Sequence, residues 1–81
     1  MDWLEEEYYD KMLAVGIPSG QATMLARLAA QLERNRGVWE RIKSEGFDGF
    51  CRWIEIQCKD IYYTIKGVLS SLWDWIKSKL G

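Results

Sequence analysis

The chain has 81 residues, of which 48% are hydrophobic and 28% are charged, and its net charge is −1. This length supports one domain at most, and the apolar content is too high for a disordered chain. The chain contains no histidine, which is the commonest general base and metal ligand, so we expect no catalytic site, no metal and no cofactor.

The first sixteen residues carry five acids against one lysine and predict a helix over residues 2–15. Asp2 begins a capping-box pattern, in which side chains at the start of a helix satisfy free backbone donors. Apolar side chains then recur at helical spacing, at Leu4, Tyr8, Met12 and Val15. Gly16 can end the helix, Ile17 can make the accompanying apolar contact, and Pro18 blocks continuation.

A second helix is predicted from residue 19, where Ser19 can act as its N-cap. Its seam positions follow the alternation of three and four residues that is typical of a heptad pattern. These positions are Leu25, Leu28, Leu32, Asn35, Trp39 and Ile42, with Asn35 as the polar member. Gly37 weakens a helix by about 1 kcal/mol relative to Ala. Two interpretations are open: one bent helix over 19–45, or two helices that meet near 35–37.

Gly46 and Gly49 predict the next break, with Asp48 as a candidate N-cap, and a third helix is predicted over 48–80. One heptad position holds Cys51, Cys58, Ile65 and Leu72, and the other holds Phe47, Ile54, Ile61, Val68 and Trp75. A continuous helix of this length would be about 50 Å long. It would need a partner along its whole seam, from the other helices or from a second chain. A bend near Gly67 is the alternative, and it would let one chain close the bundle.

The predicted fold class is therefore all-α. The expected architecture is a small bundle of three helices, or of four if the second helix splits. The long C-terminal helix forms an antiparallel hairpin with the second helix, and the first helix covers one end.

An apolar stripe lies off the seam of the third predicted helix and is the first candidate binding surface. It consists of Trp53, Ile56 and Tyr63, whose spacings of three and seven place them on the face away from the seam. Two interpretations are open: the first helix packs over the stripe, or the stripe is an interface for a dimer or a target. Both require that the stripe be covered, because large exposed apolar patches are rare on monomers.

The C-terminal stretch L-W-D-W-I-K-S-K-L-G also has two interpretations. Helices that lie on membranes combine Trp and Leu on one face with Lys on the other. The interpretation that we prefer places Leu72, Trp75 and Ile76 in the core and Trp73 as a half-exposed cap over the end of the bundle. Trp73 is therefore a candidate protein-binding residue.

The acidic start W-L-E-E-E-Y-Y-D combines clustered carboxylates with tyrosines. Such a segment can imitate nucleic-acid phosphate or bind a basic groove, although helix capping and solubility explain it more simply. Glu6 and Tyr9 are the candidate protein-binding residues of this segment.

The segment from Met12 to Arg27 places a glycine turn between two predicted helices and resembles a helix-turn-helix. However, Lys11 lies where the first helix of that motif is apolar, and Arg27 is the only base in the presumed recognition helix. Nucleic acid is therefore not the expected partner.

Cys51 and Cys58 are seven residues apart on one predicted helix, which separates them by about 10 Å and excludes a disulfide between them. Reduced thiols favour a cytoplasmic location. No uninterrupted apolar stretch reaches the roughly 20 residues of a transmembrane helix.

The predicted function is that of a small protein without enzymatic activity, which binds or inhibits another protein and forms a homodimer. Phage and mobile-element proteins that block a host factor are one group of this kind. The first alternative is amphipathic binding to a membrane surface through the C-terminal helix. The second is a helix-turn-helix-like DNA-binding regulator.

Overall fold

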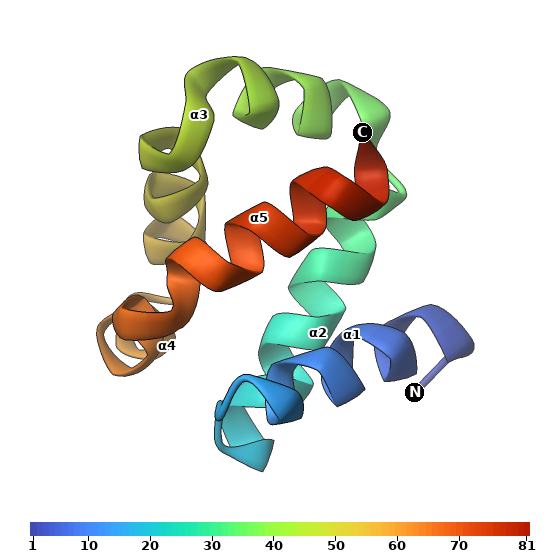
Figure 1. Ribbon diagram of the computed structural model, residues 1–81, viewed down its shortest axis with the longest axis vertical. Helices are drawn as coiled ribbons and strands as arrows, with labels where there is room; N and C mark the ends of the chain where they lie inside the picture. The colour runs from blue at the N-terminus through green and yellow to red at the C-terminus, as the bar shows by residue number, and fades with distance from the viewer.

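The computed structural model describes residues 1–81 and consists of helices joined by short turns, without a strand (Figure 1). The elements in chain order are α1 (Trp3–Ala14), α2 (Ser19–Glu33), α3 (Arg36–Gln57), α4 (Lys59–Ile65), the 3-10 turn η1 (Lys66–Val68) and α5 (Leu69–Leu80). The predicted all-α class is confirmed. The chain is divided more finely than the three or four predicted helices.

Local sequence signals define both ends of α1. The Glu5 backbone N–H donates to Oδ1 of Asp2 at 2.9 Å, so Asp2 is the N-cap. At the other end Gly16 has a φ of 93°. The Gly16 N–H donates to the carbonyl of Leu13, and the N–H of the buried Ile17 donates to that of Met12. This is a Schellman motif, and it is the ending that Gly16 and Ile17 predict.

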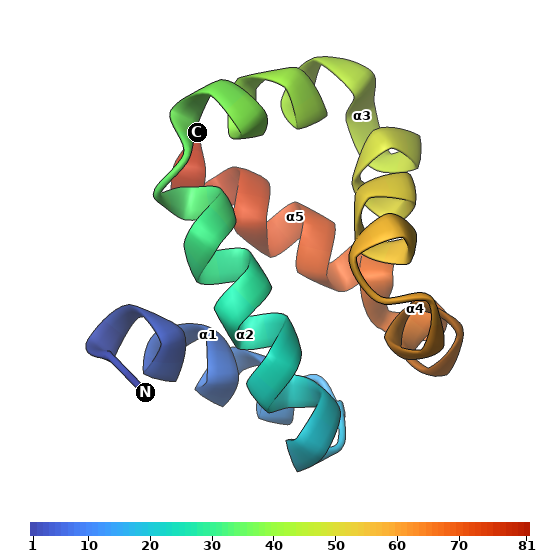
Figure 2. The same cartoon turned by 180° about the vertical axis from the view of Figure 1, so that it is seen from behind.

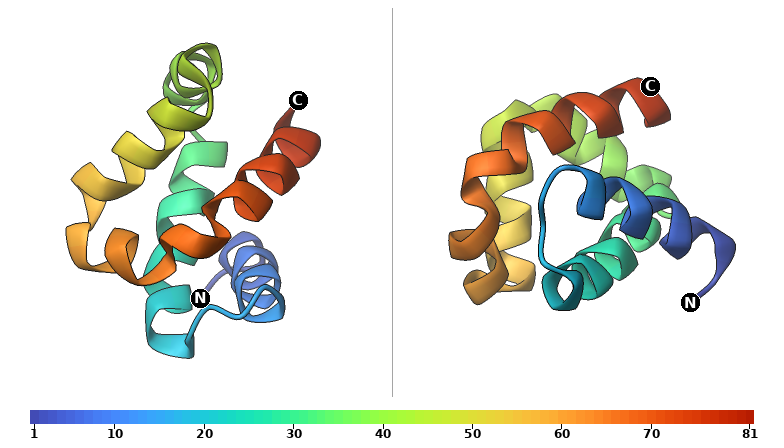
Figure 3. Two further views of the ribbon diagram at one scale, coloured as in Figure 1. Left: turned by 60° about the vertical axis from the view of Figure 1, so that its left-hand side comes forward. Right: turned by 60° about the horizontal axis from the view of Figure 1, so that its bottom comes forward.

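The buried face of α1 packs against α2 and α5 (Figure 3). It consists of Leu4, Tyr8 and Met12. Alanines on the buried face of α2 allow close approach of the backbones, and the Tyr8 ring meets the Trp75 ring edge-on at 5.3 Å.

The predicted role of Ser19 as the N-cap of α2 is wrong. Pro18 occupies the N-cap position, and the Ser19 carbonyl accepts a hydrogen bond from Thr23.

The second predicted helix is split, which was one of its two interpretations. Asn35 has non-helical φ and ψ of −121° and 86°, and its Oδ1 accepts a hydrogen bond from the Val38 N–H at 3.1 Å. Asn35 is therefore the exposed N-cap of α3 and not a polar member of a buried seam. Its short side chain offers the backbone a partner outside a continuous helix.

The predicted break between the second and third helices is confirmed at Gly46, where α3 turns a sharp corner (Figures 1 and 2). Gly46 has φ and ψ of 78° and −163°, a region that is essentially restricted to glycine. The helix resumes directly after this residue and runs to Gln57. No hydrogen bond from Asp48 caps the second half, so the predicted role of Asp48 as an N-cap is wrong.

The predicted helix over 48–80 is interrupted twice. Cys58 is extended, with φ of −156° and ψ of 99°, and residues 66–68 form η1 around Gly67. A helix of about 50 Å would exceed the molecule, whose extents are 29 × 27 × 19 Å. The two breaks turn the seam inward. Ile54, Ile61, Ile65 and Leu72 are buried in one core with residues of α1 and α2.

Candidate protein-binding surface

The corner at Gly46 creates a surface groove between the two halves of α3. Its volume is about 340 Å³, and we call it the α3 groove. It is lined by Arg41, Ile42, Glu45, Gly49, Arg52, Trp53 and Ile56. Residues from before and after Gly46 meet here, so the groove depends on the corner and would not exist on a straight helix.

Ile56 and Trp53 form the apolar part of the groove. The Ile56 side chain is 79% exposed, which is the largest value among the exposed large hydrophobic residues of the chain. Trp53 is half-buried and stacks on Phe50, with 6.4 Å between ring centroids. A smaller depression of about 140 Å³ also borders Trp53 and is lined by the side chains of Gln31, Asn35 and Gln57, among others.

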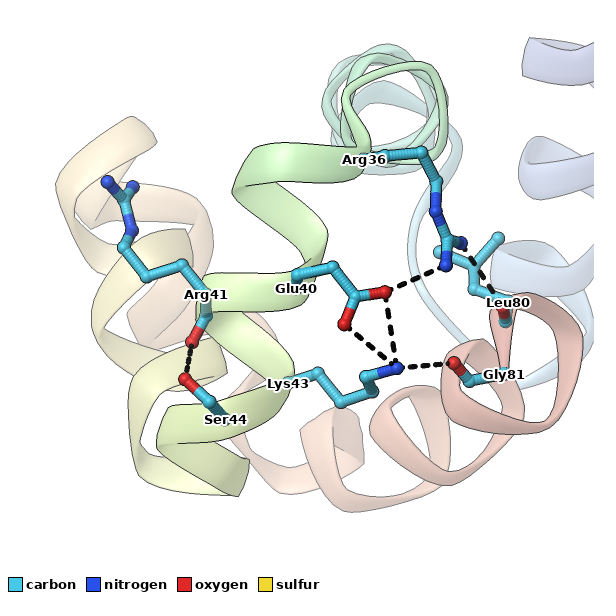
Figure 4. A network of polar contacts seen from close by, with 7 residues as sticks. All are labelled: Arg36, Glu40, Arg41, Lys43, Ser44, Leu80 and Gly81. Carbon is cyan, nitrogen blue, oxygen red and sulfur yellow. Dashed lines mark hydrogen bonds and ion pairs between the residues drawn. The ribbon is translucent and has the colours of Figure 1, made fainter.

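The two arginines of the α3 groove have no partner within the chain. The chain contains five arginines. Arg27 pairs with Glu5 at 3.9 Å, Arg34 with Asp2 at 2.9 Å and Arg36 with Glu40 at 2.8 Å. The remaining two are Arg41 and Arg52, and both line the groove. Figure 4 shows the Arg41 guanidinium extending from α3 away from the network of Glu40, while the backbone carbonyl of Arg41 accepts a hydrogen bond from Ser44.

The C-terminal end of α5 is fastened to the first half of α3 by a polar network (Figure 4). Arg36 donates to the Leu80 carbonyl at 3.3 Å, and Lys43 donates to the Gly81 oxygen at 2.7 Å. Glu40 accepts from both bases and holds them in place. These contacts fix α3 against α5 on the side away from Arg41.

All three residues of the predicted stripe remain on the surface, at least in part. Trp53 and Ile56 lie together in the α3 groove. Tyr63 is 54% exposed on α4, beyond the break at Cys58. Its hydroxyl donates to Glu55 on α3 at 3.4 Å. The predicted stripe is therefore bent at Cys58, and α1 does not cover Ile56.

The prediction that Trp73 is a half-exposed cap over the end of the bundle is wrong. This residue is only 5% exposed. Its indole packs against Phe50 and Trp39, with centroid distances of 5.1 Å and 5.6 Å. The turn at η1 rotates α5 so that Trp73 faces α3, while Trp75 becomes half-buried beside α1. Trp73 belongs to the core and is not available to a partner.

The acidic start of α1 is largely neutralised within the chain. Asp2 pairs with Arg34, Glu5 with Arg27 and Glu7 with Lys79. Glu6 is exposed and has no ion pair, and Tyr9 is half-buried against the core. Neither lines the α3 groove. The structure therefore does not bring Glu6 and Tyr9 together with Trp53 and Ile56.

Lys79 joins α1, α2 and α5 through its contacts with Glu33 and Glu7. Burial disfavours the charged ammonium, but its hydrogen bonds to Glu33 and Glu7 outweigh this effect and raise the pKa of Lys79. Burial also raises the pKa of Tyr8, and its hydrogen bond to Glu33, at 2.9 Å, adds to the shift. This cluster holds the three helices together at neutral pH.

The thiols do not form a reactive site. Burial and the nearby Asp48 carboxylate raise the pKa of Cys51, which opposes the thiolate form that nucleophilic chemistry needs. Cys51 and Cys58 are both free.

Sequence reasoning missed Arg41, Arg52, Glu45 and Gly49 as groove residues. The bases and acids around position 41 alternate, a pattern that favours a solvated helix face. Gly46 and Gly49 correctly predicted a break between two helical segments, but a break alone does not show that the side chains on its two sides face one another.

None of the helices combines the length and the apolar character that crossing a bilayer requires. No family model matches the chain, and comparison with curated proteins and with solved structures also gave no match.

Proposed function

We propose that this chain is a non-enzymatic module that binds another protein, as a binder or inhibitor, through the α3 groove. The exposure of Ile56 beside Trp53 supports this proposal most directly. An isolated exposed aliphatic residue is ordinary, but here it borders a groove that also contains an indole and two unpaired guanidinium groups. Tryptophan and arginine are the residues most often found at the energetic centre of protein interfaces.

The fixed backbone of α3 favours binding without large rearrangement. The groove is formed by a single helix around one glycine corner, and the network of Glu40 anchors the first half of that helix to α5. A preformed surface lowers the entropy cost of association. The cytoplasm is the proposed setting, since the free thiols of Cys51 and Cys58 would remain reduced there.

The membrane-surface alternative has less support from the structure. The apolar side chains of α5 that would enter a bilayer are Leu69, Leu72, Trp73 and Ile76, and all four are buried in the core. Binding would require α5 to leave α3, which would expose this core.

The DNA-binding alternative also has less support. Arg27, the base of the presumed recognition helix, is paired with Glu5. Thr23 bonds back to the carbonyl of Ser19 in its own helix. The side chains of α2 thus serve packing and local contacts.

Photo-crosslinking in the cells that make the protein tests the proposal. A photoreactive amino acid at position 56 should capture a defined partner protein. The same amino acid at position 24, where Met24 is 50% exposed on α2, should not. Equal capture at both positions would contradict the proposal.

A further inference from the structure

The unpaired arginines of the α3 groove indicate the chemistry of the partner. This inference rests on the proposed function and concerns the same surface. The groove lining contains two bases, Arg41 and Arg52, against one acid, Glu45, while the whole chain has a net charge of −1. The groove is therefore locally positive on a protein whose other three arginines are each paired with a carboxylate.

The single carboxylate of the groove does not neutralise these arginines. Glu45 forms no ion pair within 4.0 Å, and its side chain occupies the space where a Cβ atom on Gly49 would lie. A guanidinium presents a planar set of donors that matches a carboxylate in a bidentate geometry. Both guanidinium groups thus face solvent with their hydrogen-bonding capacity unused by the chain.

We infer that the α3 groove binds a partner segment in which acidic side chains stand next to apolar ones. The apolar side chains of the partner cover Ile56 and Trp53, and the carboxylates bind Arg41 and Arg52. An acidic amphipathic helix or an acidic extended peptide meets this description. Burying Ile56 supplies the apolar contribution, while the arginines select for negative charge and fix the orientation of the segment.

Nucleic acid would use the same groups differently. Arginine and tryptophan also bind phosphates and bases, and Glu45 repels a carboxylate as well as a phosphate, so it does not separate the two. Ile56 does, because its exposed side chain gains an apolar contact from a peptide and no specific contact from a nucleotide strand. A peptide therefore fits the combination of Ile56 and the two arginines better than an oligonucleotide.

The test is selection of a random 16-residue peptide library displayed on phage against the purified chain. Selected peptides are synthesised with a fluorophore, and their Kd is measured by anisotropy. Three variants are compared with the wild type: Ile56→Glu, the double variant Arg41→Gln/Arg52→Gln, and the control Arg27→Gln. Circular dichroism checks the fold of each. A single-stranded 20-nucleotide oligodeoxythymidine is titrated in parallel.

We expect selected peptides rich in Asp or Glu beside Leu, Ile or Phe. Their Kd should rise at least tenfold for Ile56→Glu and for the double arginine variant, and by less than twofold for Arg27→Gln. Peptides that need Ile56 but carry no acid, or tolerate loss of both arginines, would overturn the inference and leave the proposed function standing. Peptides that bind independently of Ile56 would overturn both. Tighter, arginine-dependent binding of the oligonucleotide would also overturn both.

Discussion

The side chain of Glu45 occupies the space in which a side chain on Gly49 would have to lie. A Cβ atom placed on Gly49 would be 2.4 Å from the Cβ of Glu45 and 2.8 Å from its Oε1. Real Cβ atoms essentially never approach this closely, and the first of these contacts involves the rigid base of the Glu45 side chain. The corner at Gly46 causes the approach, because it folds the second half of α3 back toward residue 45.

Gly49→Ala should therefore destabilise the protein by about 1–3 kcal/mol, the usual range for an overpacked site. Equilibrium unfolding in urea measures the change. Gly20→Ala is the matched control, since Gly20 lies within α2 and a Cβ there meets nothing within 4 Å. This control should be neutral or stabilising by up to about 1 kcal/mol. If Gly49→Ala is as stable as Gly20→Ala, the corner is not tightly packed.

Trp73 and Trp3 allow the stability effect of removing a buried tryptophan to be compared with that of removing an exposed one. Trp73→Ala removes an indole that packs on Phe50 and Trp39, and we expect a loss of about 3–5 kcal/mol. In a domain of this size, that loss is a large part of the total stability. Trp3 is 71% exposed, and Trp3→Ala should change the free energy of unfolding by less than about 0.5 kcal/mol. Thermal unfolding followed by circular dichroism measures the loss of stability in each variant. Similar losses for Trp73→Ala and Trp3→Ala would show that Trp73 is not a core residue.

The ends of α1 could be predicted because the signals are local. Asp2 bonds three residues ahead, and Gly16 and Ile17 bond back into the last turn. The heptad pattern also identified part of the core: Ile54, Ile61, Ile65 and Leu72 are buried, whereas the predicted seam residue Phe47 is 38% exposed next to the corner at Gly46. It could not show that the helix carrying them breaks at Cys58. That break has no glycine or proline, and it follows from the need of one short chain to enclose its own apolar face.

The candidate site was predictable only in part for a related reason. The position of Ile56 off the seam followed from the spacing within one helix, but that spacing left open whether the first helix covers it. Arg41 and Arg52 are eleven residues apart, which is about three turns, so they would share one face even of a straight helix. The corner at Gly46 turns that face into a groove. Burial of Trp73 likewise depends on how η1 rotates α5. The periodicity of a straight helix shows neither of these changes of direction.

Asn35 provides a test of the split between α2 and α3. Its side chain accepts a hydrogen bond from the Val38 N–H, so Asn35→Ala should lower stability by about 1 kcal/mol. Asn35→Asp keeps the acceptor and should retain most of that stability. Urea unfolding of both variants checks the expectation. Were Asn35→Ala the more stable of the two, the residue would lie in a continuous helix, where alanine is favoured.

The cluster of Tyr8, Glu33 and Lys79 predicts how stability depends on alkaline pH. The pKa of Tyr8 is raised above its ordinary value of 10.0 in the folded chain. Above about pH 10 the unfolded chain therefore loses the Tyr8 proton while the folded chain keeps it, and stability falls. The pKa of Lys79 is also raised, from 10.5. The stabilisation that Lys79 provides is complete below pH 10.5, and it is lost as the pH rises through the pKa that Lys79 has in the folded chain.

Tyr8→Phe should separate the contribution of Tyr8. At pH 7 it removes one hydrogen bond and should cost about 0.5–1.5 kcal/mol. Between pH 10 and 12 the stability of the wild type should fall more steeply than that of the variant, by up to about 1.4 kcal/mol per pH unit. Urea unfolding across this range measures both slopes. Parallel slopes would mean that Tyr8 titrates alike in the folded and unfolded chains.

The breaks in the C-terminal part of the chain predict a monomer in solution. The sequence left two routes to a homodimer: a second chain that covers the seam of an uninterrupted helix over 48–80, or an interface through the stripe of Trp53, Ile56 and Tyr63. The breaks at Cys58 and η1 let a single chain bury that seam, so light scattering with reductant present should give the mass of one chain, 9.5 kDa. A symmetric dimer through the α3 groove would also place Arg41 and Arg52 against their own copies, with only Glu45 to offset the repulsion. A stable dimer that becomes monomeric in Ile56→Glu would reverse this argument, because it would make a second copy of the chain the occupant of the groove.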